Sequence, residues 1–92
     1  MERRIYKSTA FRHGYGEQDF EAIMRNPTLV FRSRRGFRNV YEILGRNDAG
    51  DYLHVITRRF KKGSARIVIV FHIDRMANPD RRRYRELTET AK

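Results

Sequence analysis

The sequence predicts an α+β domain with an antiparallel sheet of about four strands, one helix on its N-terminal side and a basic C-terminal helix. β-rich runs separated by short turn signals fill the middle of the chain, and short connections favour antiparallel neighbours. Apolar residues at helical spacing occur on both sides of that block. Because 92 residues leave no room for a second core, residues 1–92 are expected to form a single domain.

The first part of the chain is predicted to contain one helix. Arg4–Lys7 fits a short strand, so residues 1–10 are expected to form either an edge strand or a flexible start. The helix should begin at Glu17, where acidic residues suit its positive end, and stop at Asn26-Pro27. Its narrow apolar face consists of Phe20, Ile23 and Met24.

Four strands are predicted between this helix and the C-terminal one. Their ranges are Thr28–Phe31, Phe37–Gly45, Tyr52–Phe60 and Ser64–Ile73. They are separated by the basic turn Arg32–Gly36, the loop Gly45–Gly50 and the turn Lys61–Gly63. The longest apolar run, Ile67–Phe71, is far shorter than the roughly 20 residues that a membrane span needs, so we expect no membrane segment.

Strand alternation predicts a helix-covered face and an opposite, mixed face. In the last strand the apolar set is Ile67, Ile69, Phe71 and Ile73, and the mixed set is Arg66, Val68, Val70 and His72. If the mixed faces of the last two strands align, they form a basic groove with two imidazoles and an aromatic ring. The members of this groove would be Tyr52, His54, Arg58, Arg66 and His72.

The C-terminal segment is predicted to be a basic helix with a thin apolar anchor. Asn78 is expected as its N-cap, and Pro79 fits its first turn. Tyr84 and Leu87 are expected to dock the helix on the sheet, because residues three apart share a helix face. Residues 88–92 are expected to form a frayed tail. The arginines that would radiate outward are Arg81, Arg82, Arg83 and Arg85.

Composition favours a polyanionic partner. Lys+Arg 21 against Asp+Glu 11 gives a formal net charge of +10, and so short a chain repels itself unless anions are nearby. A basic surface kept for solubility alone is the competing interpretation, although acidic residues serve solubility better. The absence of cysteine excludes disulfides and thiolate metal sites, and no secretory signal follows Met1, so a cytoplasmic location is expected.

Five short stretches carry a family resemblance through their order and spacing: His13–Glu17, Gly45–Gly50, Leu53–Val55, Arg75–Ala77 and Arg83–Glu86. Together they resemble the BrnT family of bacterial toxins over about residues 11–86. The resemblance implies a fold similar to the RelE ribonucleases, a type II toxin role and neutralisation by a cognate protein antitoxin. It also implies that operator DNA is bound only by the toxin–antitoxin complex. The chain departs from the family at its start, which lacks the family's acidic, tryptophan-containing segment and first helix.

Metal-independent RNA cleavage needs a group that takes the 2′-hydroxyl proton, cations near the phosphate and a group that protonates the leaving oxygen. The candidate catalytic residues are His54, Arg58, His72, Arg75 and Tyr84, of which Arg75 and Tyr84 also match the family pattern. The candidate phosphate-binding residues are Arg46, Arg66, Arg81, Arg82, Arg83 and Arg85. Structural roles stay open: each imidazole as a half-buried polar group of the sheet, and Tyr84 as the anchor of its helix.

No metal site and no cofactor are expected. The chain has neither a His-Glu-x-x-His motif nor clustered aspartates, and its three histidines are scattered along the sequence. His13, beside Gly14, is interpreted as a turn residue.

The leading hypothesis is a metal-independent ribonuclease toxin that cleaves RNA, inhibits translation and is neutralised by its antitoxin. The first alternative is a non-catalytic nucleic-acid-binding or regulatory domain, and the second is an interaction module for an acidic protein partner. Apolar residues on the mixed face need a cover, which a homodimer, the terminal helix or a hetero-oligomer with the antitoxin would supply. These residues are Ile56, Val68 and Val70.

Overall fold

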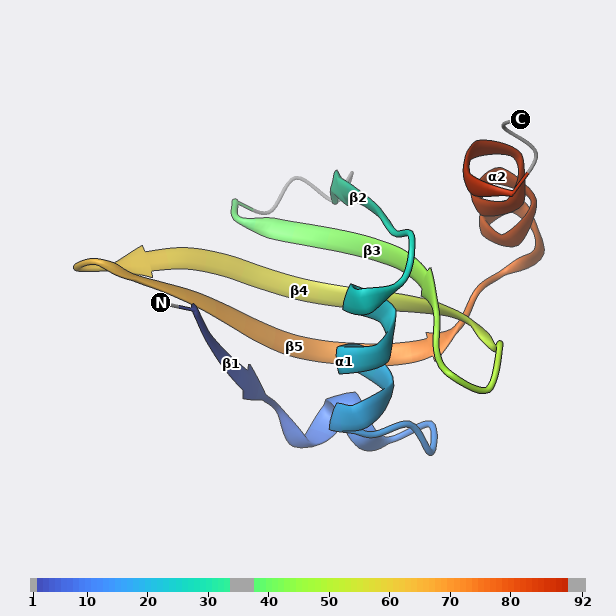
Figure 1. Cartoon of the computed structure of the whole chain (residues 1–92). Coiled ribbons are helices and arrows are strands. Elements are labelled where there is room, and N and C mark those ends of the chain that lie inside the picture. The colour runs from blue at the N-terminus through green and yellow to red at the C-terminus, as the bar shows by residue number, and fades with distance from the viewer. Residues whose placement is uncertain (1, 34–37, 90–92) are drawn as a thin grey trace.

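A five-stranded sheet in the order β1-β5-β4-β3-β2 organises the chain in a computed structural model that describes residues 2–33 and 38–89 (Figure 1). The elements are β1 (Glu2–Tyr6), the 3-10 helix η1 (Ser8–Phe11), α1 (Glu17–Arg25), β2 (Leu29–Arg32), β3 (Val40–Arg46), β4 (Tyr52–Lys62), β5 (Ala65–Arg75) and α2 (Asn78–Thr88). α1 lies across one face of the sheet, whereas α2 stands at one end, beyond the C-terminal end of β5 (Figure 1). The α+β class is therefore confirmed.

The sheet has five strands rather than about four, because the N-terminal segment pairs with the last strand. β1 runs parallel to β5, from Glu2 opposite Arg66 to Tyr6 opposite Val70. The Lys7 amide then donates a hydrogen bond of 2.9 Å to the Val70 carbonyl. β2 to β5 form an antiparallel meander, as the short connections predicted.

The main core fills the space between the sheet and the layer formed by η1 and α1. α1 begins at Glu17 and ends before Asn26, as predicted. Gly45 lets α1 approach β3 closely, because a Cβ at this position would lie 2.5 Å from the Cγ2 atom of Ile23. The buried residues of this core are Ala10, Phe20, Ile23, Ile43, Leu53, Val55, Val68, Val70 and Ile73.

A β-bulge in β5 overturns the predicted division of that strand into two faces. Ile56 pairs with His72 and the next residue, Thr57, pairs with Val70, so Phe71 is an extra residue. The alternation shifts there, and Val68 and Val70 lie in the main core rather than on the mixed face. Period-two alternation of side chains holds only along an uninterrupted strand, so it assigned Val68 and Val70 to the wrong face.

α2 docks differently from the prediction. Tyr84 is buried and its hydroxyl donates a 2.7 Å hydrogen bond to the Pro27 carbonyl, but Leu87 is 56% exposed. Successive residues turn by about 100°, so Leu87 sits about 60° away from Tyr84 around the helix axis and misses the sheet. Met76, just before the helix, supplies the second buried contact. The N-cap is Ala77 rather than Asn78.

Three predicted segments fall partly outside the described residues. These are residues 34–36 of the basic turn, Phe37 at the start of the second predicted strand, and residues 90–92 of the tail. The start of that tail, Thr88, is the last residue of α2. Among the described residues, no helix combines the length and the apolar character needed to cross a membrane.

Candidate active site

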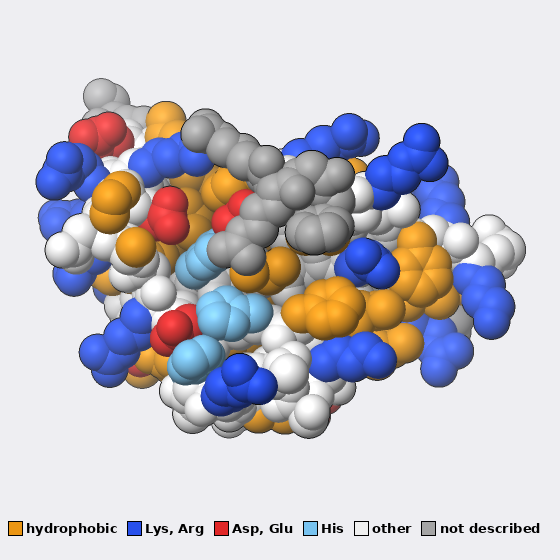
Figure 2. Space-filling model, turned by 180° about the vertical axis from the view of Figure 1, so that it is seen from behind, with side chains coloured by type: hydrophobic (Ala, Val, Ile, Leu, Met, Phe, Trp, Pro, Cys, Tyr) orange, Lys and Arg blue, Asp and Glu red, His pale blue; other side chains and the backbone are white. Residues whose placement is uncertain are grey.

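The sheet face that points away from α1 carries the candidate site, and we call it the open face. Strand alternation and the bulge place Glu42 of β3, His54 and Arg58 of β4, and His72 and Asp74 of β5 on this face. Figure 2 shows this side of the molecule, with the three histidine side chains gathered near its middle and acidic side chains beside them. α2 covers only one end of the open face, where it packs on Leu44.

His54 is held by a carboxylate on the neighbouring strand. Its Nε2 atom lies 2.7 Å from Oε1 of Glu42, and both side chains are largely buried, with 18% and 19% of their surfaces exposed. The two residues lie diagonally across the β3–β4 ladder, because Glu42 pairs with Ile56 and His54 pairs with Leu44. Glu42 therefore fixes the orientation of the imidazole, and sequence analysis did not single it out.

His72 lies close to His54, as the aligned mixed faces predicted. The two imidazole centroids are 6.2 Å apart, with the ring planes at 69°. The register of β4 and β5 is the reason: His54 pairs with Asp74 and Ile56 pairs with His72, so the two histidines are diagonal neighbours on one face. The register therefore brings together two of the predicted catalytic residues.

His13 lies next to this pair, and the sequence did not predict that position. Its ring centroid is 5.1 Å from that of His72, and its Nδ1 atom is 3.8 Å from Oδ2 of Asp74. His13 lies just before Gly14, which has φ of 88° and turns the chain back towards β5. The His-Gly turn was the only local signal, and it did not reveal which strand the turn would meet.

The other three members of the predicted groove differ in where they lie relative to the imidazole pair. Arg66 lies beyond the bulge, on the α1 side of the sheet with Val68, so its predicted place beside the histidines is wrong. Arg58 is on the open face but four residues beyond His54, or about 13 Å along an extended strand. Tyr52 is on the open face two residues before His54, and its ring packs against the cluster of Leu44, Met76 and Tyr84 at the α2 end.

Arg75 and Tyr84 are also separated from the imidazole pair. Arg75 lies opposite Leu53 in the ladder, on the α1 side, and its Nε atom donates a 3.1 Å hydrogen bond to the Tyr15 hydroxyl. This hydrogen bond raises the pKa of Arg75. Tyr84 lies on the buried side of α2 and is 2% exposed, and its burial raises the pKa of its hydroxyl. The structure thus gives Tyr84 the anchoring position.

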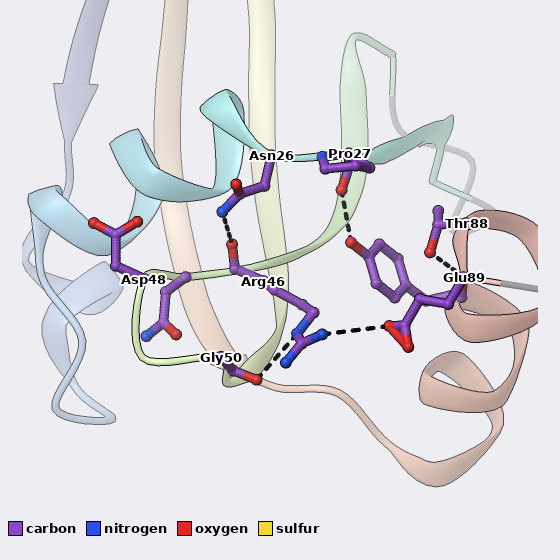
Figure 3. Close-up of a pocket in the computed structure, with 9 residues that line it drawn as sticks. Asn26, Pro27, Arg46, Asp48, Gly50, Thr88 and Glu89 are labelled. Carbon is purple, nitrogen blue, oxygen red and sulfur yellow. Dashed lines mark hydrogen bonds and ion pairs between the residues drawn. The ribbon is translucent and has the colours of Figure 1, made fainter.

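Several predicted phosphate-binding arginines gather at the α2 end of the sheet. The guanidinium carbons of Arg46 and Arg81 lie 4.6 and 4.5 Å from the centroid of the Tyr52 ring. Arg46 also lines a pocket of about 370 Å³, where Nε donates to the Gly50 carbonyl at 3.2 Å and a terminal nitrogen lies 3.6 Å from Glu89 (Figure 3). Arg46 is thus engaged within the protein.

The remaining arginines of α2 differ in their contacts. Arg83 lies over the Phe31 ring at 4.7 Å, and Arg85 forms an ion pair of 3.6 Å with Glu89. All the predicted arginines of α2 are exposed, so their charge reaches solvent.

The open face therefore presents two adjacent imidazoles, one of them oriented by a carboxylate. The positive net charge of the protein would attract an anionic ligand to them. Among the predicted phosphate-binding and catalytic arginines, Arg58 and those of α2 lie at a distance from the pair rather than beside it. No family model and no curated protein matches this chain in sequence comparisons.

Proposed function

We propose that this protein is a metal-independent endoribonuclease that acts as the toxin of a type II toxin–antitoxin system. The observation that carries the proposal is the pair formed by His54 and His72, with centroids 6.2 Å apart on the open face. Glu42 orients the first imidazole at 2.7 Å. The formal net charge of +10 adds attraction for an RNA chain.

The tautomer of His54 follows from its contact with Glu42. When Nε2–H donates to the carboxylate, Nδ1 carries the free lone pair and can accept a proton. His54 then acts as the general base that takes the proton of the ribose 2′-hydroxyl. Glu42 stabilises the imidazolium that results.

His72 supplies the second proton transfer. The 2′-oxygen attacks phosphorus, and the bond from phosphorus to the 5′-oxygen breaks as that oxygen takes a proton from protonated His72. The products are a 2′,3′-cyclic phosphate and a free 5′-hydroxyl, and proton transfer back between the imidazoles restores the starting state. Two adjacent rings suffice for this step because a single phosphodiester can reach both.

Arginines on both sides of the imidazole pair would hold neighbouring phosphates. Arg58 lies on the open face along β4, and the exposed Arg82 lies on α2 at the other end. Such contacts position the strand without reading its sequence. RNA would therefore run along the sheet, from the α2 end towards the β4–β5 hairpin.

Cleavage of an end-labelled RNA in EDTA tests the catalytic proposal. We expect His54→Gln and His72→Gln each to reduce the cleavage rate by about 10²-fold or more, because each removes one proton-transfer group. Glu42→Gln should give a smaller loss, since the imidazole stays in place without its orienting charge. Arg25→Gln, which removes one charge from α1 on the other side of the sheet, should leave the rate unchanged.

Circular dichroism and thermal unfolding of each variant separate loss of chemistry from loss of fold. Cleavage by folded His54→Gln and His72→Gln at the wild-type rate would show that the imidazole pair is not the active site. RNA that stays intact with wild-type protein but binds it at low salt would replace the ribonuclease proposal with the non-catalytic one.

The toxin role also predicts how expression of the protein affects cell growth. Expression of the wild-type chain should arrest growth and translation, and His54→Gln should not. Co-expression of the cognate antitoxin, for which an acidic segment would suit the basic surface, should restore growth. Growth arrest by His54→Gln at equal expression would contradict a toxin whose action depends on cleavage.

Nucleic-acid binding without cleavage is the second candidate, and the arginines of α2 favour it. They are exposed and lie apart from the imidazole pair, so they could hold a phosphate backbone in the absence of any chemistry. As part of an antitoxin complex, the same helix could contact operator DNA. If this candidate is correct, the affinity for nucleic acid should fall steeply with salt. Wild type and His54→Gln should then bind nucleic acid with the same affinity.

A further inference from the structure

We propose that His13, His72 and Asp74 form a binding site for a divalent transition-metal ion of the Zn²⁺ class. One nitrogen from each imidazole and one carboxylate oxygen all lie within 4.8 Å of one another. The three side chains come from the turn before α1 and from the open face of β5, near its C-terminal end, and the site faces solvent (Figure 2).

The spacing is close to what a metal ion requires. Ligand atoms about 2.0–2.1 Å from a tetrahedral Zn²⁺ lie roughly 3.4 Å from each other. Side chains of His13 and Asp74 are 35% and 40% exposed, so small rotations about their side-chain bonds bring the three atoms to that spacing.

Two contacts hold the turn that carries His13 against the part of β5 that carries the other ligands. Before the turn, the Thr9 hydroxyl donates a 2.8 Å hydrogen bond to the Phe71 carbonyl. After the turn, Nε of Arg75 donates to the Tyr15 hydroxyl at 3.1 Å. These hydrogen bonds hold the turn against Phe71 and Arg75, which directly flank His72–Asp74. The position of His13 beside the other two ligands is therefore set by the fold.

The two oxygens of Asp74 are divided between structure and site. Oδ1 accepts a 2.7 Å hydrogen bond from the Arg75 amide, which fixes the carboxylate plane. Oδ2 faces His13, at 3.8 Å from its Nδ1 atom. Many metal-binding carboxylates are oriented in the same way, by a hydrogen bond to one of their oxygens. Such a hydrogen bond reduces the side-chain entropy that is lost when the ion binds.

Two nitrogen ligands and one oxygen ligand select the class of ion. Imidazole suits Zn²⁺, Co²⁺ and Ni²⁺, whereas Mg²⁺ and Ca²⁺ prefer sites built from oxygen. Three protein ligands leave at least one coordination position for water or for a phosphate oxygen. We therefore expect the site to bind Zn²⁺ and Co²⁺ in preference to Mg²⁺.

A consequence for cleavage rests on the proposed function. An ion on His72 would occupy a ring nitrogen of a residue that the cleavage reaction uses, so Zn²⁺ should inhibit cleavage rather than support it. The binding site itself does not depend on cleavage, since metal binding is measured without RNA.

Isothermal titration of the purified full chain with Zn²⁺, and visible absorption with Co²⁺, test the site. We expect one ion per chain, and a weakening of more than about tenfold in His13→Gln, which loses one of three ligands. His54→Gln is the matched control, because it removes a neighbouring imidazole and leaves all three ligands in place. Wild-type affinity in this control is the expected result.

The outcomes separate this site from other arrangements. Absence of Zn²⁺ binding by the folded wild type, or equal affinity in wild type and His13→Gln, would overturn the proposal. Weakening in His54→Gln as large as in His13→Gln would also overturn it, since the ion would then use a different set of ligands. Failure of RNA cleavage with Zn²⁺ binding intact would affect only the ribonuclease proposal.

Discussion

At the scale of single residues, Glu21 of α1 connects the added edge strand to the main core. Its carboxylate accepts a 2.8 Å hydrogen bond from the Tyr6 hydroxyl and forms an ion pair with Arg4, whose guanidinium lies over the Phe20 ring. Burial alone would raise the pKa of Glu21, but the hydrogen bonds from Arg4 and Tyr6 lower it below the ordinary value of 4.5. Burial and the same hydrogen bond raise the pKa of Tyr6.

A carboxylate with a lowered pKa makes stability depend on pH in a defined direction. Glu21 stabilises the fold fully above pH 4.5 and loses that contribution as the pH falls through its lower folded value. Glu21→Gln should lower the free energy of unfolding by about 1 kcal/mol at pH 7, because the group is partly exposed, and by less in acid. Urea unfolding at pH 7 and pH 3 measures both values.

The matched control for this residue is Asp48→Asn. Asp48 forms an exposed ion pair of 3.3 Å with Arg25, so its removal should change stability little at either pH. A loss in Glu21→Gln that is equally large at pH 3 and pH 7 would show that the carboxylate charge is not what holds β1 to α1.

At the scale of elements, the one buried residue of α2 is an aromatic side chain whose hydroxyl is hydrogen-bonded. Tyr84 packs with Leu44 and Met76 and donates to the Pro27 carbonyl at 2.7 Å. We expect Tyr84→Phe to cost about 1 kcal/mol through the lost hydrogen bond, and Tyr84→Ala to cost about 3–5 kcal/mol through the cavity. Leu87→Ala should stay within about 0.5 kcal/mol, since Leu87 is 56% exposed.

Urea unfolding of the three variants gives these differences directly. A cost for Leu87→Ala as large as that for Tyr84→Ala would mean that α2 docks through both residues, as the spacing alone suggested. Retained cleavage by folded Tyr84→Phe would also establish that its hydroxyl has no catalytic part.

At the scale of the whole molecule, net charge would govern the RNA binding proposed above. Figure 2 shows Lys and Arg side chains around the rim of the open face, and the formal net charge is +10. We expect RNA affinity to fall linearly with salt on a double-logarithmic plot, by a slope of about 0.7 for each phosphate neutralised. Arg82→Gln should reduce that slope by about 0.7, because it removes one exposed cation beside the proposed RNA path.

Fluorescence anisotropy with a labelled single-stranded RNA at several salt concentrations measures the slope. Arg25→Gln removes the same charge from the α1 side and should keep the wild-type slope. Equal reductions in both variants would indicate that RNA responds to net charge alone rather than to a path across the open face.

The sequence by itself determined the elements and the electrostatic character of the protein. Helical spacing and the Asn26-Pro27 stop located α1, and turn residues located the four meander strands. Strand alternation also predicted that His54 and His72 would meet if the mixed faces of their strands aligned, and the register of β4 and β5 supplies that alignment. The elements themselves depend on neighbours in sequence, whose geometry a short pattern specifies.

Only the tertiary structure decided which groups surround the imidazole pair. The bulge at Phe71 sent Arg66 to the α1 side, and the docked turn brought His13 to Asp74. The fifth strand and the exposure of Leu87 were decided in the same way. The physical reason is that these placements depend on contacts between residues far apart in the chain, such as Thr9 with Phe71, which no local periodicity records.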